Sequence, residues 1–440
     1  MELQIEKLVY GGDGLARLPA DERGRGKTVF LPFVVPGERV EATVTERRSG
    51  FARARLNSVL MPSPDRTAPH CPYFGRCGGC QYQHIDYPAQ LRYKAEILRE
   101  TLRRTAKLEL EHEIRVHPSE PWCYRNRTRV RVQHDPDFAL GYFRGNSHQL
   151  LPVEECPISS PLINQAIRAG WELGRAGKVL GVVHGMQFFA NHDDSELLVE
   201  VYIRPDAAAN DCGPLASALR SVLNAVTGVA VFAAPLVEDE TWQFAPLSSV
   251  RDSDSVSYSN DSLIYHAVGH DYKVGGGSFF QTNRFLIDDL AKIAIEGATG
   301  RTALDLYAGV GLFTLPMAAK FEEVIAVEAS PHAFADLKHN APRNSRTIRA
   351  TTEAFLEKQA GKLQPDFVLV DPPRAGLGDK VTTALCRTSA SRVTYVSCDP
   401  ATLSRDLRLL LESGFKVEQA HLFDLFPQTA HMETVLHLVR

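Results

Sequence analysis

Short strand-like runs alternate with turn residues over the first 60 positions of the chain. The turns are marked by the Gly-Gly-Asp-Gly run at 11–14 and by Pro36-Gly37, and the segments between them are short. Strands of this length and spacing predict a small closed β-barrel, which we expect to form a first domain at residues 1–60. The proline-rich stretch 61–66 that follows predicts a linker.

A longer segment, residues 67–265, is predicted to form a β-rich central domain. Its clearest strands are 186–190 and 197–202, and a helix-capable stretch at 163–174 precedes them. A further helix is predicted near 88–106. Although it lies within this segment, it is a candidate to pack on the domain that follows.

The pattern changes again near residue 301, where apolar runs alternate with helix-like segments. Such alternation is typical of a doubly wound α/β fold, in which a parallel sheet is covered on both faces. The last residues instead predict an antiparallel hairpin that closes this sheet. We expect a third domain at residues 266–440, with strands at 302–306, 324–327, 367–370, 393–396, 416–423 and 434–439.

Composition narrows the class of protein. With 44% hydrophobic and 23% charged residues, the chain is expected to be globular. Its start has no basic region followed by an apolar stretch, and no run approaches the roughly 18 apolar residues needed to cross a bilayer. We therefore expect a cytoplasmic protein without membrane contact, in which clustered cysteines serve metal binding or catalysis rather than disulfides.

A cofactor site is predicted at the first strand of the third domain. Residues 303–313 indicate a strand, a tight turn and a helix start, and Gly309 and Gly311 would let a nucleotide-like ligand approach the backbone. Glu328 ends the next strand, where a carboxylate can accept hydrogen bonds from two ribose hydroxyls. Thr314 replaces the third glycine of a dinucleotide fingerprint, which favours S-adenosylmethionine over NAD. A merely structural glycine turn is the alternative.

Two further strand ends carry unusual residues, Asp371 and Cys398. Because ligands bind outside the carboxyl ends of parallel strands, both should face the same crevice as Gly309 and Glu328. A thiolate is suited to add at C6 of a uracil, which makes C5 nucleophilic toward a methyl sulfonium. A base must then remove the C5 proton so that the thiol can leave.

Glu433 is the preferred base, because the reaction needs one that works in a largely desolvated pocket; nearby His431 is more often structural. Taken alone, Cys398 would be interpreted as a buried structural cysteine, and its neighbours Asp371 and Glu328 reverse that preference. The other cysteines outside the N-terminal cluster are interpreted as structural, namely Cys123, Cys212 and Cys386.

Five motifs resemble those of the RNA uracil-C5 methyltransferases in order and spacing over about the last 160 residues. The resemblance implies a Rossmann-like methyltransferase domain with Cys398 as nucleophile and Glu433 as base. Asp399 departs from it, since many members have asparagine there, and we interpret it as a tolerated variant. The implied S-adenosylmethionine contacts are Gln281, Tyr307, Glu328 and Asp371. The motifs are Phe279-Phe280-Gln281-Thr282-Asn283, the turn 305–311, Asp371-Pro372-Pro373-Arg374, Ser397-Cys398-Asp399-Pro400-Ala401-Thr402-Leu403 and His431-Met432-Glu433-Thr434.

A cysteine cluster opens the central segment. Cys71, Cys77 and Cys80 lie close in sequence, and Cys156 before a proline is a fourth candidate ligand. Four thiolates could hold zinc or an iron–sulfur cluster, and the absence of paired C-x₂-C knuckles mildly disfavours zinc. The resemblance implies a [4Fe-4S] cluster, whose role we expect to be structural because methyl transfer moves no net electrons.

RNA is the expected partner, although the net charge is −4. Arg125, Arg127, Arg129 and Arg131 occupy alternate positions, so on a strand their guanidinium groups would line one face and could match a phosphate backbone. A solvated sheet face is the alternative. The N-terminal barrel, OB-like in its strand pattern, also resembles a TRAM domain, an RNA-binding module.

The combined prediction is a monomeric enzyme that forms 5-methyluridine in a flipped-out uracil of RNA. The joined TRAM-like domain and cluster favour 23S ribosomal RNA over transfer RNA as its substrate. Two alternatives stay open. A cytosine-C5 RNA methyltransferase shares the thiolate chemistry but should place its cysteines in other loops, and a non-catalytic iron–sulfur protein could bind RNA without reacting.

Overall fold

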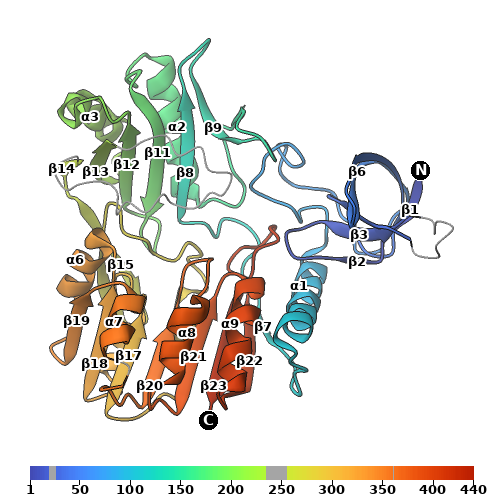
Figure 1. Ribbon diagram of the computed structural model, residues 1–440. Coiled ribbons are helices and arrows are strands. Elements are labelled where there is room, and N and C mark those ends of the chain that lie inside the picture. The colour runs from blue at the N-terminus through green and yellow to red at the C-terminus, as the bar shows by residue number, and fades with distance from the viewer. Residues whose placement is uncertain (19–25, 234–254, 360) are drawn as a thin grey trace.

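The computed structural model describes residues 1–18, 26–233, 255–359 and 361–440. The described residues form a small barrel, a central sheet with helices on one face, and a larger α/β layer that contains the C-terminus (Figure 1). Residues 234–254, which belong to the predicted central domain, lie outside the described residues. No described helix is long and apolar enough to span a membrane.

The described residues up to Met61 form a six-stranded sheet that curls around its own core, as the turn pattern predicts. Alternate residues such as Val40 and Ala52 are fully buried inside it. The buried Glu38 carboxylate pairs with Arg66 and so fastens the barrel to the following segment. Its strands, in the order β1-β5-β6-β4-β3-β2, are β1 (Glu2–Gln4), β2 (Lys7–Leu8), β3 (Gly14–Arg17), β4 (Thr28–Leu31), β5 (Arg39–Arg47) and β6 (Phe51–Met61).

The central sheet contains the predicted hairpin and the predicted helix. Helix α2 (Pro161–Arg175) begins where Ser160 accepts a hydrogen bond from the Ile163 N–H, and its apolar face packs on the sheet beside α3 (Gly213–Val222). The sheet order is β10-β9-β8-β11-β12-β13-β14. These strands are β8 (Arg127–Gln133), β9 (Ala139–Phe143), β10 (Leu150–Pro152), β11 (Val183–Ala190), β12 (Leu197–Ile203), β13 (Val226–Ala233) and β14 (Ser255–Ser259).

The C-terminal layer is the predicted doubly wound sheet, with order β19-β18-β17-β20-β21-β23-β22-β7. Its four inner parallel strands are buried on both faces, and β22 and β23 form the predicted antiparallel hairpin. The strands are β17 (Thr302–Leu306), β18 (Glu323–Glu328), β19 (Ser345–Arg349), β20 (Phe367–Val370), β21 (Arg392–Ser397), β22 (Lys416–Phe423) and β23 (Glu433–Val439).

Helices cover both faces of this sheet. One face packs against α7 (Thr352–Gln359), α8 (Gly378–Cys386) and α9 (Pro400–Glu412). The opposite face packs against α4 (Ile287–Ala294), α5 (Thr314–Ala318), α6 (Pro331–Asn340) and the hairpin of β15 (Ser262–Ala267) and β16 (His270–Gly275).

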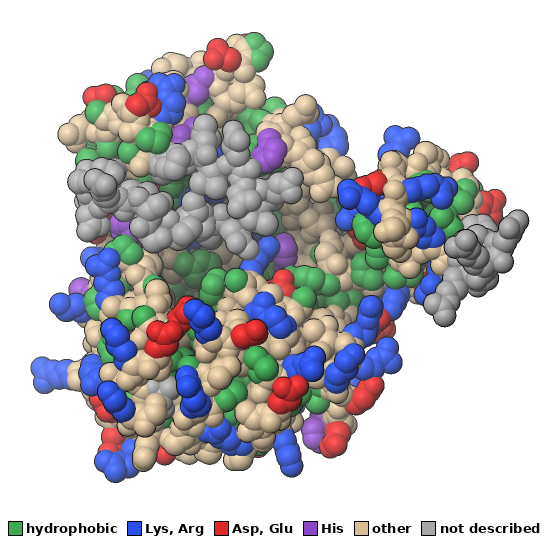
Figure 2. Space-filling model, in the orientation of Figure 1, with side chains coloured by type: hydrophobic (Ala, Val, Ile, Leu, Met, Phe, Trp, Pro, Cys, Tyr) green, Lys and Arg blue, Asp and Glu red, His purple; other side chains and the backbone are tan. Residues whose placement is uncertain are grey.

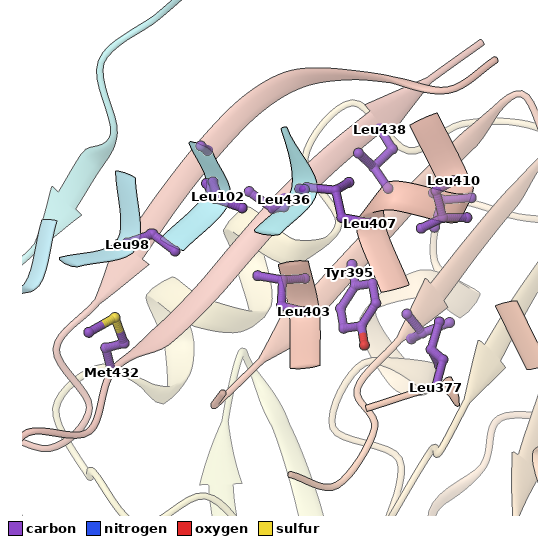
Figure 3. Close-up of a cluster of buried hydrophobic side chains, with 14 of the residues drawn as sticks. Leu98, Leu102, Leu377, Tyr395, Leu403, Leu407, Leu410, Met432, Leu436 and Leu438 are labelled. Atoms are coloured by element: carbon purple, nitrogen blue, oxygen red, sulfur yellow. The ribbon is translucent and has the colours of Figure 1, made fainter. Parts of the chain in front are cut away.

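Two elements from the predicted central segment belong to this layer, of which the helix was expected to pack here and the strand was not. Helix α1 (Tyr87–Thr101) and the turn after it pack Leu98 and Leu102 among leucines of α9, as Figure 3 shows. Strand β7 (Arg115–His117) pairs in parallel with the outer edge of β22. The chain therefore completes its C-terminal layer with residues 87–117 before it enters the central sheet, because the apolar face of α1 needs α9 for burial.

A buried ion pair fixes α1 to the tip of the β22–β23 hairpin. Lys94 Nζ lies 2.6 Å from Asp424 Oδ1, and both side chains are fully buried. Lys94 also donates to the Phe426 carbonyl at 3.2 Å. A buried charge is tolerated only with such partners, so this contact determines where the loop before Glu433 can lie.

Breaking this pair should destabilise the C-terminal layer strongly. Lys94→Met leaves the Asp424 carboxylate buried without its partner, which should cost roughly 3–5 kcal/mol of unfolding free energy. Arg408→Met, which breaks the exposed pair with Glu412 on α9, should cost at most about 0.5 kcal/mol. Urea unfolding followed by circular dichroism measures both, and equal losses would contradict the role given to Lys94.

Candidate active site

The polar strand ends meet at one edge of the C-terminal sheet. Asp371 follows β20 and Cys398 follows the neighbouring β21, while Glu328 ends β18, which is separated from β20 by β17. Strand β23 runs antiparallel to β21 with Thr434 opposite Ser397, so Glu433 and Cys398 extend to the same edge. The register thus brings together residues that the sequence predicted to share a crevice.

The glycine turn after β17 has the open backbone expected of a ligand cradle. Gly309 and Gly311 have φ values of +56° and +99°, and Tyr307 adopts +65° although it carries a side chain. Glu328 accepts hydrogen bonds from the Gly309 N–H at 2.9 Å and the Ser330 N–H at 2.6 Å. These contacts hold the Glu328 carboxylate beside the turn.

Thr314 has a structural reason for replacing glycine. Its hydroxyl donates to Asp305 Oδ2 at 2.5 Å, and both side chains are fully buried. Burial raises the pKa of Asp305 to about 7. Thr314 therefore stabilises the glycine turn through Asp305, whereas a glycine at this position would leave the backbone open to a pyrophosphate.

Gln281 lies on the segment between β16 and α4, where its side chain is buried. The neighbouring Asn283 donates to the Leu425 carbonyl at 3.1 Å, and the Asn126 N–H bonds to the Thr282 carbonyl. The segment that carries Gln281 is therefore held both by the hairpin before Glu433 and by the central sheet.

A thiol and two carboxylates share the pocket at the ends of β20, β21 and β23. Cys398 is half-buried, and burial together with the nearby Glu433 and Asp371 carboxylates raises the pKa of its thiol. Burial and Asp371 raise the pKa of Glu433 well above its ordinary value. Burial also raises the pKa of Asp371 to about 7, with a contribution from Asp305.

Arg374 places a positive charge near Cys398 and Glu433, although its motif gave no hint of that role. Its positive charge opposes the upward pKa shifts of both Cys398 and Glu433. It also acts with burial to lower the pKa of His431 to about 3, so that ring is neutral near pH 7. The arrangement can therefore stabilise a thiolate when it forms and hold a proton on a neighbouring carboxyl.

The four predicted ligand cysteines come together in the structure. Burial raises the pKa of Cys71, Cys77 and Cys80, and the nearby Cys156 thiol adds to the rise at each of the three. The Gly79 N–H donates to Cys77 Sγ at 3.4 Å. Backbone amides pointing at sulfur are suited to a metal–sulfur centre.

No three of these four described cysteine sulfurs lie within 4.8 Å of one another. Tetrahedral zinc thiolate sites need sulfurs about 3.8 Å apart. Among the described residues, the one set of three metal-ligand atoms within 4.8 Å of one another is Glu296, His421 and His437. His421 already bonds to His117 at 2.9 Å and to Gln419 at 3.0 Å, so this set is part of a hydrogen-bonded histidine network.

The predicted row of arginines makes contacts within the protein, and Arg125, which precedes β8, is half-buried and donates to the Arg127 carbonyl at 2.9 Å. Arg127 is 2% exposed and pairs with the buried Glu200 carboxylate at 2.7 Å. Arg129 lies over the Tyr202 ring at 4.1 Å, and Arg131 lies over Phe143 at 5.2 Å. A strand whose arginines face phosphates and a strand whose arginines stack on aromatic rings of the same protein show the same alternation. The sequence alone therefore could not distinguish the two cases.

Known protein families match both the N-terminal barrel and the C-terminal layer of this chain. A model described as tRNA (Uracil-5-)-methyltransferase matches residues 255–440, and a TRAM domain model matches residues 1–56. An uncharacterized RNA methyltransferase of Aquifex aeolicus is 32% identical over 99% of this chain and 97% of that protein. The 23S rRNA (uracil(1939)-C(5))-methyltransferase RlmD of Alkalilimnicola ehrlichii is also 32% identical, over 99% of this chain and 95% of its own.

A solved structure shares the whole architecture. It is the crystal structure of the Pyrococcus abyssi tRNA (uracil-54, C5)-methyltransferase in complex with S-adenosyl-L-homocysteine. The two chains match over 100% of each, with a TM-score of 0.76 and 23% identity. This likeness confirms the predicted fold class, an α/β methyltransferase layer with an N-terminal barrel and a β-rich central part.

The charges around Cys398 predict opposite pH shifts for two variants. Glu433→Gln removes a negative charge, so alkylation of Cys398 by iodoacetamide should reach its half-maximal rate at a lower pH. Arg374→Met removes the positive charge and should move that midpoint to a higher pH. Mass spectrometry of the Cys398 peptide follows the reaction, with Cys386 as a distant internal control that should not change. Shifts in the same direction would contradict this assignment of charges.

Proposed function

The chain belongs to the S-adenosylmethionine-dependent RNA uracil-C5 methyltransferases, and we propose that it forms 5-methyluridine in 23S ribosomal RNA. The support for this substrate is that full-length relatives named for 23S ribosomal RNA match 98–99% of the chain. The structural neighbour that acts on transfer RNA is the alternative, but at 23% identity it bears on the fold alone.

The adjacency of Cys398 and Glu433 carries the proposed mechanism. Cys398, as thiolate, adds to C6 of the uracil, and C5 becomes an enolate carbon. S-adenosylmethionine supplies the methyl group to C5 when it is bound. Glu433 then takes the C5 proton, the C5–C6 double bond re-forms, and the C6–Sγ bond breaks to return the thiolate.

Arg374 and burial together determine the protonation of Cys398 and Glu433 on which the addition and proton-removal steps depend. Burial keeps Cys398 as a thiol in the absence of substrate, and Arg374 favours the thiolate that must attack once the thiol proton has left to solvent. Burial raises the proton affinity of Glu433 and Arg374 opposes that rise, so Arg374 also favours the ionised carboxylate that must take the proton from C5. The electron-rich enolate is thereby formed next to a cation.

Four residues are proposed to bind the methyl donor. The turn at Gly309 lets the ligand approach the backbone, and Glu328 is held beside it to accept hydrogen bonds from ribose hydroxyls. Asp371 follows β20, which is separated by β17 from the strand that ends at Glu328, and it is proposed to contact the same ligand. Gln281 and Tyr307 complete the proposed set, for which the family resemblance is the support.

Cys71, Cys77, Cys80 and Cys156 are proposed to hold a [4Fe-4S] cluster. The support is their convergence, the wide sulfur spacing and the Gly79 amide on sulfur. Such a cluster would supply structural cross-links here, because uracil methylation needs no electron transfer. Its place beside the loop at 78–83 would fix that loop against the residues before Glu433.

RNA contact is proposed for the barrel and the rim of the pocket. The barrel exposes Arg47, Arg48, Arg53 and Arg55, and Figure 2 shows Lys and Arg side chains on its face and on the C-terminal layer. Such clustered cations raise affinity for a phosphate backbone in a salt-dependent manner. The uracil must leave its stack to reach Cys398, which is half-buried.

Loss of the nucleophile and of the RNA modification tests the function. Cys398→Ala should lower methylation of 23S ribosomal RNA by about 10⁴-fold or more, because no other group replaces the thiolate. RNA from a strain lacking the gene should lose one or more 5-methyluridines in 23S ribosomal RNA. Nucleoside mapping by mass spectrometry checks this, and loss confined to transfer RNA would overturn the proposed substrate.

Anaerobic purification tests the metal. The wild-type protein should contain iron and sulfide with a broad visible absorbance band, and Cys80→Ser should lose both and unfold at lower temperature. Cys123→Ser, which changes a cysteine outside the proposed set, is the control. Stoichiometric zinc without iron would contradict the proposed cluster.

A further inference from the structure

The N-terminal barrel reaches the residue next to the proposed nucleophile. Tyr10 lies in the loop between β2 and β3, and its phenol donates to Asp399 Oδ2 at 3.0 Å. Asp399 directly follows Cys398 in the chain. Tyr10 also packs, half-buried, against the main apolar cluster of the C-terminal layer, so the contact is part of a packed junction.

Asp399 uses its two carboxylate oxygens for two separate purposes. Oδ1 accepts the backbone N–H groups of Ala401 and Thr402, each at 2.9 Å, and so caps the start of α9. Oδ2 is left for Tyr10. The turn that carries Cys398 is therefore fixed from inside by the helix cap and from outside by the barrel.

The phenol of Tyr10 is held in the form that can donate. Burial, followed by the charge of Asp399, raises the pKa of Tyr10, so its proton stays in place throughout the physiological range. A hydrogen bond to a charged acceptor is stronger than one between neutral groups. The contact is thus strong enough to influence where the turn lies.

The same barrel loop touches the segment that precedes the proposed base. A Cβ atom on Gly12 would lie 3.0 Å from Gln81 Cβ and 3.2 Å from Ala430 Cβ, so the loop approaches both closely. Gln81 Oε1 in turn accepts the Ala430 N–H at 3.1 Å, three residues before Glu433. The barrel loop therefore contacts the supports of both proposed reacting groups.

We propose that Tyr10 is a positioning residue for methyl transfer, which through Asp399 holds the Cys398 thiol in line with the bound uracil. The barrel then completes the catalytic pocket in addition to binding RNA. This role rests on the proposed function of Cys398. It differs from a general docking role, which a second barrel contact performs: Lys7 pairs with Glu100 on α1 at 2.5 Å, away from the pocket.

Tyr10→Phe tests the proposal, with Lys7→Met as the matched barrel variant. Tyr10→Phe removes one hydrogen bond to a charged group, so the rate of covalent adduct formation with saturating 5-fluorouridine RNA should fall about tenfold. The RNA concentration at half-saturation should change by less than about twofold. Lys7→Met should leave the adduct rate within about twofold of wild type. A tenfold rise in half-saturating RNA with an unchanged rate would make Tyr10 an RNA contact and overturn the proposal.

A double-mutant cycle tests whether Tyr10 acts through Asp399. Adding Tyr10→Phe to Asp399→Ala should cause no further loss of rate, and a full additional tenfold loss would contradict the coupling. Asp399→Asn should stay within about twofold of wild type, because its oxygen still caps α9 and its amide can donate to the phenol oxygen. A loss as large as that of Asp399→Ala would contradict this geometry.

A measurement without RNA separates this proposal from the proposed function. Tyr10→Phe should speed iodoacetamide alkylation of Cys398, because a loosened turn exposes a half-buried thiol, whereas Lys7→Met should not. Unchanged alkylation in Tyr10→Phe would overturn the positioning role. If the wild-type protein forms no adduct with RNA while Tyr10→Phe still alters alkylation, the proposed function fails and the link between Tyr10 and Cys398 stands.

Discussion

Arg374 stands among three groups that burial makes reluctant to ionise, the Cys398 thiol and the carboxyls of Glu433 and Asp371. Without a cation, a thiolate beside two carboxylates would be strongly unfavourable, and the pocket would hold an inert thiol. With it, the thiolate can form when substrate arrives, while the carboxyl next to it keeps a high proton affinity. The proposed roles of Cys398 as nucleophile and Glu433 as base both draw on this balance between burial and the Arg374 charge.

The rest of the fold holds that balance in place. Cys398 is held between the end of β21 and the capped start of α9. Glu433 begins β23, which pairs antiparallel with β21. The loop before Glu433 is held in turn by the buried Lys94–Asp424 pair. The barrel and the cysteine loop add contacts from outside the sheet, which explains why a methyltransferase layer carries two further modules packed against its active edge.

Much of this arrangement could be predicted from the sequence. Apolar strands alternating with helices specify a parallel sheet, and in such a sheet Glu328, Asp371 and Cys398 must end at one edge. Glu433 could be placed at the same edge because the predicted final hairpin adds an antiparallel strand to the sheet, and Glu433 begins that strand. These are local patterns with a regular period, and local patterns remain visible without coordinates.

What the sequence did not reveal consists of contacts between distant residues. The bond from Tyr10 to Asp399 joins positions 389 apart, and neither residue has a local signal for it. The packing of α1 on the C-terminal layer was expected for the helix near 88–106, whereas the pairing of β7 with β22, which joins residues about 300 positions apart, had no local signal. Within β8, Arg127 pairs with Glu200 and Arg129 lies over Tyr202, and neither partner is visible from the alternation of arginines.

The most direct test of the account is the mass of the protein after Glu433→Gln has reacted with uridine-containing RNA and S-adenosylmethionine. If Glu433 removes the C5 proton, the reaction should stop after methyl transfer, and intact-mass analysis should find protein joined to RNA with one added methyl group. Disappearance of this species in Glu433→Gln/Cys398→Ala would assign the bond to Cys398. Rapid release of free 5-methyluridine RNA by Glu433→Gln would contradict the central claim that this carboxylate is the base.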